Sequence, residues 1–232
     1  MKLAEIAFAC HIYGPMTEYD RSYQQFLNIT KPQLDLSQEQ HCLALLKWLN
    51  DWGCRQFAIE YHKMAAEQLR TWFQDKVYRL VPCDLNLLDF TDDDFNSVTF
   101  AYAELVSMKA CQRITRNGSL STIEFGPTGT AKILFALRPN SLIPWDIPMR
   151  SKFKYDGSAE DYMDYLKFVR ENLEELNNAC IARGYSLTEL PHLLGRPKSS
   201  LTKLIDEYFW VTVSRNCPAP SRQELNQWAL WW

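Results

Sequence analysis

Apolar residues recur at every third or fourth position between Ser158 and Arg183, and this is the most regular pattern in the chain. Such spacing gives a helix one apolar face, so it predicts a long helix that packs on one side and ends at Gly184. A similar pattern starts at Ser37. Strand-like alternation is confined to short pieces near the N-terminus and around residues 209–213. The sequence therefore predicts a mainly all-α fold.

The length of the chain allows two helical lobes that share a cleft. Its 232 residues, 47% of them apolar, are enough to bury a substantial core. We expect one helical domain over residues 38–140, with a tight turn between two helices at residues 119–138. Residues 1–37 and 141–232 are expected to form the second lobe.

The sequence shows no pattern typical of a membrane segment, a disulfide framework or a metal site. No run reaches the ~18 apolar residues of a membrane span, and the N-terminus has an early Glu5 and no cleavage site of small residues. The seven cysteines include no C-x-x-C pair, and the four histidines lack metal-ligand spacing. We therefore expect a cytoplasmic, monomeric protein without membrane association, metal or other cofactor.

Positive charge is concentrated in about one fifth of the chain, although the net charge is −3. Between Lys109 and Lys154, eight Lys and Arg residues stand against only Glu124 and Asp146, which gives this stretch a net charge of +6. A single positive face on an acidic body would suit the binding of a phosphate backbone, because affinity depends on local counterion release. The alternative is an ordinary solvated basic surface.

The sequence GPTGT at residues 126–130 predicts a tight turn before an apolar helix. Gly126 and Gly129 can adopt positive φ, and Thr128 or Thr130 can cap the helix. The unpaired amides at such a helix start, with Lys132 one turn further on, would bind a phosphate. Plain loop geometry is the alternative. The turn is not a nucleotide-binding P-loop, because the lysine does not follow the second glycine directly.

Asp146 lies between two prolines, 17 residues after the second glycine of the turn. Pro148 then falls in the first turn of the next segment, which predicts that Asp146 caps a new helix. A capping carboxylate is worth ~1 kcal/mol as a purely structural feature. It is also held ionised and aimed, which suits a group that stabilises an oxocarbenium-like centre or orients water.

The segments IEFGPTGTAKILFAL and PWDIPMR together resemble the helix-hairpin-helix DNA glycosylases, over about 27 residues and in a divergent form. The signature of that superfamily is a Gly-Pro-rich hairpin followed by a catalytic aspartate. The resemblance makes Asp146 the catalytic carboxylate and Arg150 a phosphate or pocket contact. Lys132 and Lys152, which belong to the basic stretch, are expected as further DNA contacts. The hairpin residues that it assigns to a DNA phosphate are Gly126, Thr128, Gly129 and Thr130.

The chain departs from the bifunctional members of this superfamily, which carry a nucleophilic lysine in the hairpin. The equivalent position is Gly129, so the resemblance implies a monofunctional enzyme that hydrolyses the N-glycosidic bond and leaves an abasic site. Such an enzyme extrudes its target base from double-stranded DNA. Trp145 is the candidate wall of the base pocket, and an ordinary core tryptophan is the alternative.

The sequence leaves several functions open. The overall sequence also resembles bacterial antiviral glycosylases, which implies a glucosylated or hydroxymethylated cytosine of phage DNA as one expected substrate. The alternative is an oxidised or alkylated base in repair. A non-enzymatic DNA-structure sensor is a further possibility. A helix-turn-helix regulator is another, because Gly195 separates two helical patterns. Its recognition helix would begin with Arg196, Lys198, Ser199, Ser200 and Lys203.

Overall fold

The computed structural model describes residues 1–54 and 59–229, and 66% of the chain is helical against 5% strand. This confirms the predicted all-α class. The α-helices are α1 (Leu3–Met16), α2 (Tyr19–Ile29), α3 (Glu39–Asp51), α4 (His62–Lys76), α5 (Asp92–Val106), α6 (Gly126–Leu137), α7 (Ile147–Phe153), α8 (Ala159–Ile181), α9 (Leu190–Leu193), α10 (Leu201–Phe209) and α11 (Arg222–Ala229). The shorter elements are the 3-10 turns η1 (Ile59–Tyr61), η2 (Val77–Arg79), η3 (Leu87–Asp89) and η4 (Leu187–Glu189), the π-helical turn η5 (Trp210–Ser214), and the strands β1 (Lys109–Ile114) and β2 (Leu120–Glu124).

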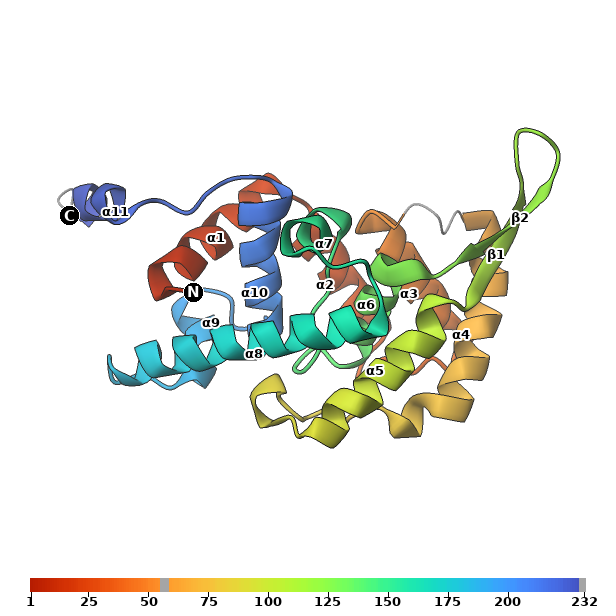
Figure 1. Cartoon of the computed structure of the whole chain (residues 1–232), viewed down its shortest axis with the longest axis horizontal. Helices are drawn as coiled ribbons and strands as arrows, with labels where there is room; N and C mark the ends of the chain where they lie inside the picture. Colours follow the sequence, from red (N-terminus) through yellow and green to blue (C-terminus); the bar gives the residue numbers. More distant parts are fainter. Residues whose placement is uncertain (55–58, 230–232) are drawn as a thin grey trace.

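The helices form two groups around one continuous core (Figure 1). In one group α1 packs on α10, and α7 lies against η5. In the other, α3 packs on α4 and α5 packs on α6. Helix α8 runs along the molecule and contacts both α5 and α10. The N-terminal arm divides between the groups, because α2 packs on α3, whereas the sequence prediction placed all of residues 1–37 in the second lobe.

The strongest sequence patterns correspond to helices. The stripe from Ser158 becomes α8, and the Ser158 hydroxyl accepts a hydrogen bond from the amide of Asp161 as its N-cap. None of the helices in the described part of the chain combines the length and the apolar character needed to cross a bilayer.

The prediction of two helices around a tight turn at residues 119–138 is wrong for the first helix. Residues Leu120–Glu124 form a strand that pairs antiparallel with β1, and the loop between the strands contains Asn117 and Gly118, a pair that favours hairpins. Gly118 has a φ of +81°, as such a turn requires. The apolar piece before Gly126 was too short to distinguish a strand from a helix by periodicity.

The short strand-like pieces expected elsewhere are also helical. The N-terminal piece forms α1, and residues 209–213 fall at the end of α10 and in the π-helical turn η5. Tertiary packing overrides local β propensity in both cases, because α1 and α10 bury their apolar residues against one another.

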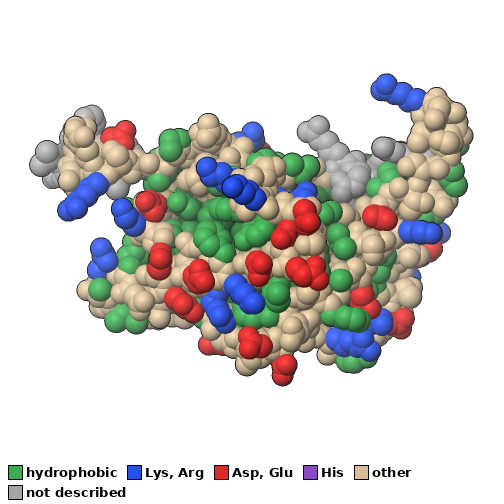
Figure 2. Space-filling view, viewed as in Figure 1, with side chains coloured by type: hydrophobic (Ala, Val, Ile, Leu, Met, Phe, Trp, Pro, Cys, Tyr) green, Lys and Arg blue, Asp and Glu red, His purple; other side chains and the backbone are tan. Residues whose placement is uncertain are grey.

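The predicted single positive face is wrong as well. Lys132 and Arg138 are only 8% and 6% exposed, and both donate to backbone carbonyl groups. The hairpin that carries Lys109 and Arg116 extends away from the body (Figure 1). Figure 2 shows a row of acidic side chains along α8, with basic side chains gathered over α7. Sequence neighbours of like charge are thus dispersed by the fold.

Candidate functional site

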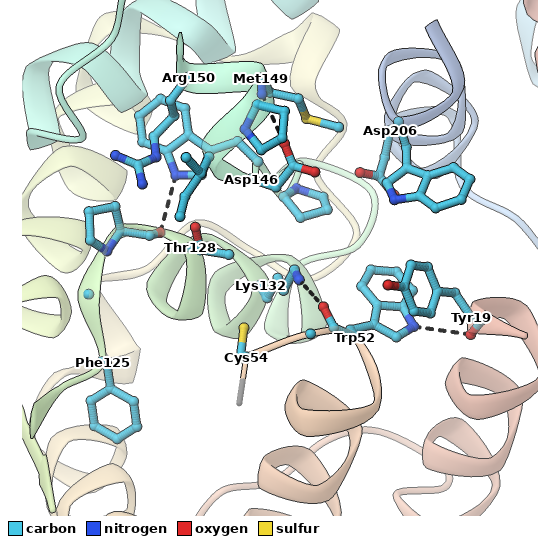
Figure 3. Close-up of a pocket in the computed structure, with 18 of the residues that line it drawn as sticks. Tyr19, Trp52, Cys54, Phe125, Thr128, Lys132, Asp146, Met149, Arg150 and Asp206 are labelled. Carbon is cyan, nitrogen blue, oxygen red and sulfur yellow. Dashed lines mark hydrogen bonds between the residues drawn. The ribbon is translucent and has the colours of Figure 1, made fainter. Parts of the chain in front are cut away.

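A cavity of about 420 Å³ opens between the two helix groups (Figure 3). Its walls come from α1 and α2, the end of α3, the start of α6, the segment around Asp146, and α10 with η5. The volume lies within the range of roughly 300–1,000 Å³ that is typical of small-molecule sites. The lining residues used below are Tyr13, Tyr19, Trp52, Cys54, Gly126, Pro127, Thr128, Lys132, Trp145, Asp146, Met149, Arg150, Asp206 and Trp210.

Asp146 caps α7 as the sequence predicts. Its Oδ1 accepts a hydrogen bond from the amide of Met149 at 2.9 Å. Its Oδ2 accepts a second one from the Ser214 hydroxyl, at 2.6 Å. The carboxylate is half-buried and borders the cavity. It is therefore fixed at both oxygens while it faces an open space.

The glycine turn is the first turn of α6 rather than a loop in front of it. Gly126 has a φ of +66° and follows the N-cap residue Phe125. Gly126 and Thr128 line the cavity, and first-turn amides have no partner within a helix. The buried Oγ1 of Thr128 likewise has no hydrogen-bond partner in the described part of the chain.

Two of the predicted hairpin residues lie elsewhere. Gly129 and Thr130 are buried inside α6, and Gly129 does not have a positive φ. Gly129 therefore does not use the positive φ that is open to a glycine, because the helix begins at Gly126. Of the four predicted hairpin contacts, only Gly126 and Thr128 border the cavity.

Trp145 joins the two halves of the site. Its Nε1 donates to the carbonyl oxygen of Pro127 at 3.1 Å, which links the segment before Asp146 to the first turn of α6. The side chain is 1% exposed and stacks on Tyr165 with ring centroids 5.4 Å apart. Trp145 thus contributes to the cavity wall mainly as a core residue that positions its neighbours.

The predicted cations have different environments. Arg150 lines the cavity, and its Nη1 donates to the carbonyl of Asp156 at 3.2 Å. Lys132 also lines the cavity, but it is only 8% exposed and its Nζ donates to the carbonyl of Trp52. Lys152 is exposed on α7 and lies outside the cavity lining.

An aromatic wall faces Asp146, and the sequence analysis missed it. Tyr19 lies near both Trp52 and Trp210, with ring centroids 5.8 Å and 5.6 Å apart. Tyr13 meets Trp210 edge-on at 5.2 Å. These residues come from α1, α2, α3 and η5, so no local pattern in the sequence brings them together.

Asp206 is a second acid at the cavity that the sequence analysis did not single out. It is 6% exposed and belongs to α10. Burial raises its pKa to about 7, and the nearby ammonium of Lys203 opposes that increase. Burial also raises the pKa of the Cys54 thiol, which Lys132 opposes.

The segment that resembled a helix-turn-helix does not present a free recognition helix. Lys203, at the start of α10, is 1% exposed, and its Nζ lies 2.9 Å from Oε1 of Glu207. Arg196 pairs with Asp20 and Glu207. Only Lys198 of the three expected cations is exposed. A helix buried along this face cannot enter a DNA groove.

Among the described residues, no group of three or more His, Cys, Asp or Glu side chains is placed to hold a metal ion. Comparison of the chain with protein-family models, curated proteins and solved structures finds no match in any of the three.

Proposed function

We propose that this protein is a monofunctional DNA glycosylase, which binds a modified base in the cavity and hydrolyses its N-glycosidic bond with the help of Asp146. One observation carries the proposal: Asp146 and the first turn of α6 border the same cavity, although they are separate in the sequence. The Trp145–Pro127 hydrogen bond holds them in that arrangement.

Asp146 supplies the negative charge of the proposed reaction. Its two hydrogen bonds are donated by Met149 and Ser214, so the carboxylate acts as an acceptor at both oxygens and keeps its orientation. As the bond between C1′ and the base breaks, positive charge develops on the sugar, and a fixed carboxylate stabilises it. A water molecule then adds its oxygen to C1′ and leaves an abasic site.

The remaining walls of the cavity suit a flipped nucleotide. The first-turn amides of α6 offer hydrogen bonds to its phosphate, at the positive end of a helix dipole. Tyr19, Trp52 and Trp210 offer apolar ring surface to the base. Gly129 stands where the bifunctional enzymes carry a nucleophilic lysine, and Lys132 donates to the Trp52 carbonyl, so the proposal includes no Schiff-base step and no strand nick.

The proposed substrate is a cytosine that carries a glucosyl or a hydroxymethyl group, as in phage DNA, and the proposed role is antiviral. Oxidised and alkylated bases are the competing substrates, and their release would place the enzyme in base-excision repair.

The test is incubation with duplexes that contain each of these bases, followed by mass detection of the free base and alkaline cleavage at abasic sites. Wild type is expected to release one class of base, and Asp146→Asn is expected to release less by roughly 10²-fold or more. Asp164→Asn is the matched control, because Asp164 is exposed on α8 and outside the cavity lining. Equal background release by wild type and Asp146→Asn from every duplex would reject the proposal.

A further inference from the structure

A buried network of charges lies behind the aromatic wall. Arg196 pairs with Asp20 and Glu207. Nζ of Lys203 lies 2.9 Å from Oε1 of Glu207 and 3.6 Å from Oδ1 of Asp20. These two cations and two carboxylates balance one another, so the network is neutral without Asp206.

Asp206 is a third carboxyl group beside these two cations. Its Oδ2 lies 3.7 Å from Nζ of Lys203, which is beyond hydrogen-bond distance. No hydrogen bond from the described residues reaches its carboxyl group. Its pKa is raised to about 7, mainly by burial, with smaller increases from Glu207 and Asp146 and opposing effects of Lys203 and Lys132. The phenols that face it from other helices belong to Tyr13, Tyr23 and Tyr165.

Asp206 and Asp146 also face one another. Figure 3 shows their carboxyl oxygens directed into the cavity from opposite walls. Asp146 is held as an acceptor by two donors, whereas Asp206 has none among the described residues. Two acids in one cleft with such different surroundings are suited to different roles.

We propose that Asp206 is the general acid of this cleft, the group that protonates the departing base while Asp146 stabilises the sugar cation. This inference rests on the proposed glycosylase function. As the C1′–N bond breaks, its electron pair passes to the base, and the Asp206 carboxyl proton is transferred to a nitrogen or oxygen of that base. Water adds its oxygen to C1′ and releases one proton, which restores the Asp206 acid. The net reaction consumes one water.

The test compares wild type with Asp206→Asn, a neutral side chain of the same shape. Single-turnover base release by wild type is expected to fall as the pH rises through about 7, because the acid form is lost. Asp206→Asn is expected to release base more slowly by roughly 10²-fold or more, without this fall between pH 6 and 8. Its affinity for uncleaved substrate duplex is expected to stay within about twofold of wild type. Asp206→Glu restores an acid and is expected to recover part of the rate.

An unchanged rate and pH profile in Asp206→Asn, with Asp164→Asn as the neutral reference, would overturn the inference. A second measurement needs neither the variant nor a substrate. In wild-type protein labelled with ¹³C at the aspartate carboxyl carbons, one carboxyl signal is expected to titrate near pH 7. A spectrum in which every aspartate titrates below about pH 5 would overturn the inference as well.

The two proposals fail in different ways. If wild type releases base, Asp146→Asn does not, and Asp206→Asn equals wild type, only the role of Asp206 is lost. If wild type releases no base from any duplex, the proposed function and the role of Asp206 both fail, even if an aspartate titrates near pH 7.

Discussion

At the scale of single residues, the orientation of the Asp146 carboxylate depends on one backbone donor and one side-chain donor. The amide of Met149 follows from the N-cap position, so the sequence predicted it. The Ser214 hydroxyl comes from 68 residues further along the chain. No spacing rule connects the two, because Ser214 ends the π-helical turn η5 and meets Asp146 only in the folded chain.

Replacement of Ser214 tests its positioning role. Ser214→Ala removes a hydrogen bond to a charged group, worth ~1.5 kcal/mol, so base release is expected to slow about tenfold. Affinity for the substrate duplex is expected to change little, because Ser214 lies outside the cavity lining. Single-turnover kinetics and a binding titration measure both quantities. Ser107→Ala, at an exposed helix end, is the control. A wild-type rate in Ser214→Ala would contradict the role.

The burial of Asp206 also predicts how the stability of the protein depends on pH. Its pKa is higher in the folded protein than the unfolded value of 3.8, so the stabilisation from its proton is complete below about pH 4 and is lost as the pH rises through about 7. Asp206→Asn cannot lose that proton. The free energy of unfolding of the variant relative to that of wild type is therefore expected to increase by on the order of 2–4 kcal/mol from pH 5 to pH 8. Urea unfolding at both pH values measures this difference, and an equal difference at both would contradict it.

At the scale of elements, the sequence predicted long amphipathic helices well and short apolar pieces poorly. Helix α8 has a repeated apolar stripe and a Ser158 cap, and both are local signals. Strand β2 spans five residues, and η5 continues α10 without a sequence signal of its own. Whether such a piece becomes a strand or a helix depends on partners that lie elsewhere in the chain.

The start of α6 gives a prediction at this scale. Gly126 has a φ of +66° and open space where a Cβ atom would lie, so Gly126→Ala is expected to cost about 1–2 kcal/mol from backbone strain alone. Gly14, inside α1, also has open space but no positive φ. Gly14→Ala is therefore expected to stabilise the protein by up to about 1 kcal/mol. Urea unfolding of both variants measures these changes, and changes of the same sign would contradict this explanation.

At the scale of the whole molecule, the sequence predicted only the parts of the cavity wall that α6 and Asp146 form. Tyr13 and Trp210 meet in one wall although nearly the whole chain separates them. The ion pairs of Asp20 with Arg196 and Lys203 likewise depend on segments that come together only in the folded chain. Charge counted along the chain was misleading for the same reason, since it assigned the buried Lys132 to a surface.

The direction from which DNA approaches separates the proposed enzyme from a helix-turn-helix regulator. Lys152, on α7, and Lys198, before α10, are both exposed, so the same substitution can be made at each. Helix α7 starts at the cavity, because Asp146 caps it. Lys152→Glu is therefore expected to weaken duplex binding several-fold and to reduce the slope of log affinity against log salt by about 1, whereas Lys198→Glu leaves both unchanged. Fluorescence anisotropy over a series of salt concentrations measures both quantities. The reverse pattern would place the DNA at α10 and away from Asp146. At α10 the buried Lys203 and the paired Arg196 leave few groups that could contact a base.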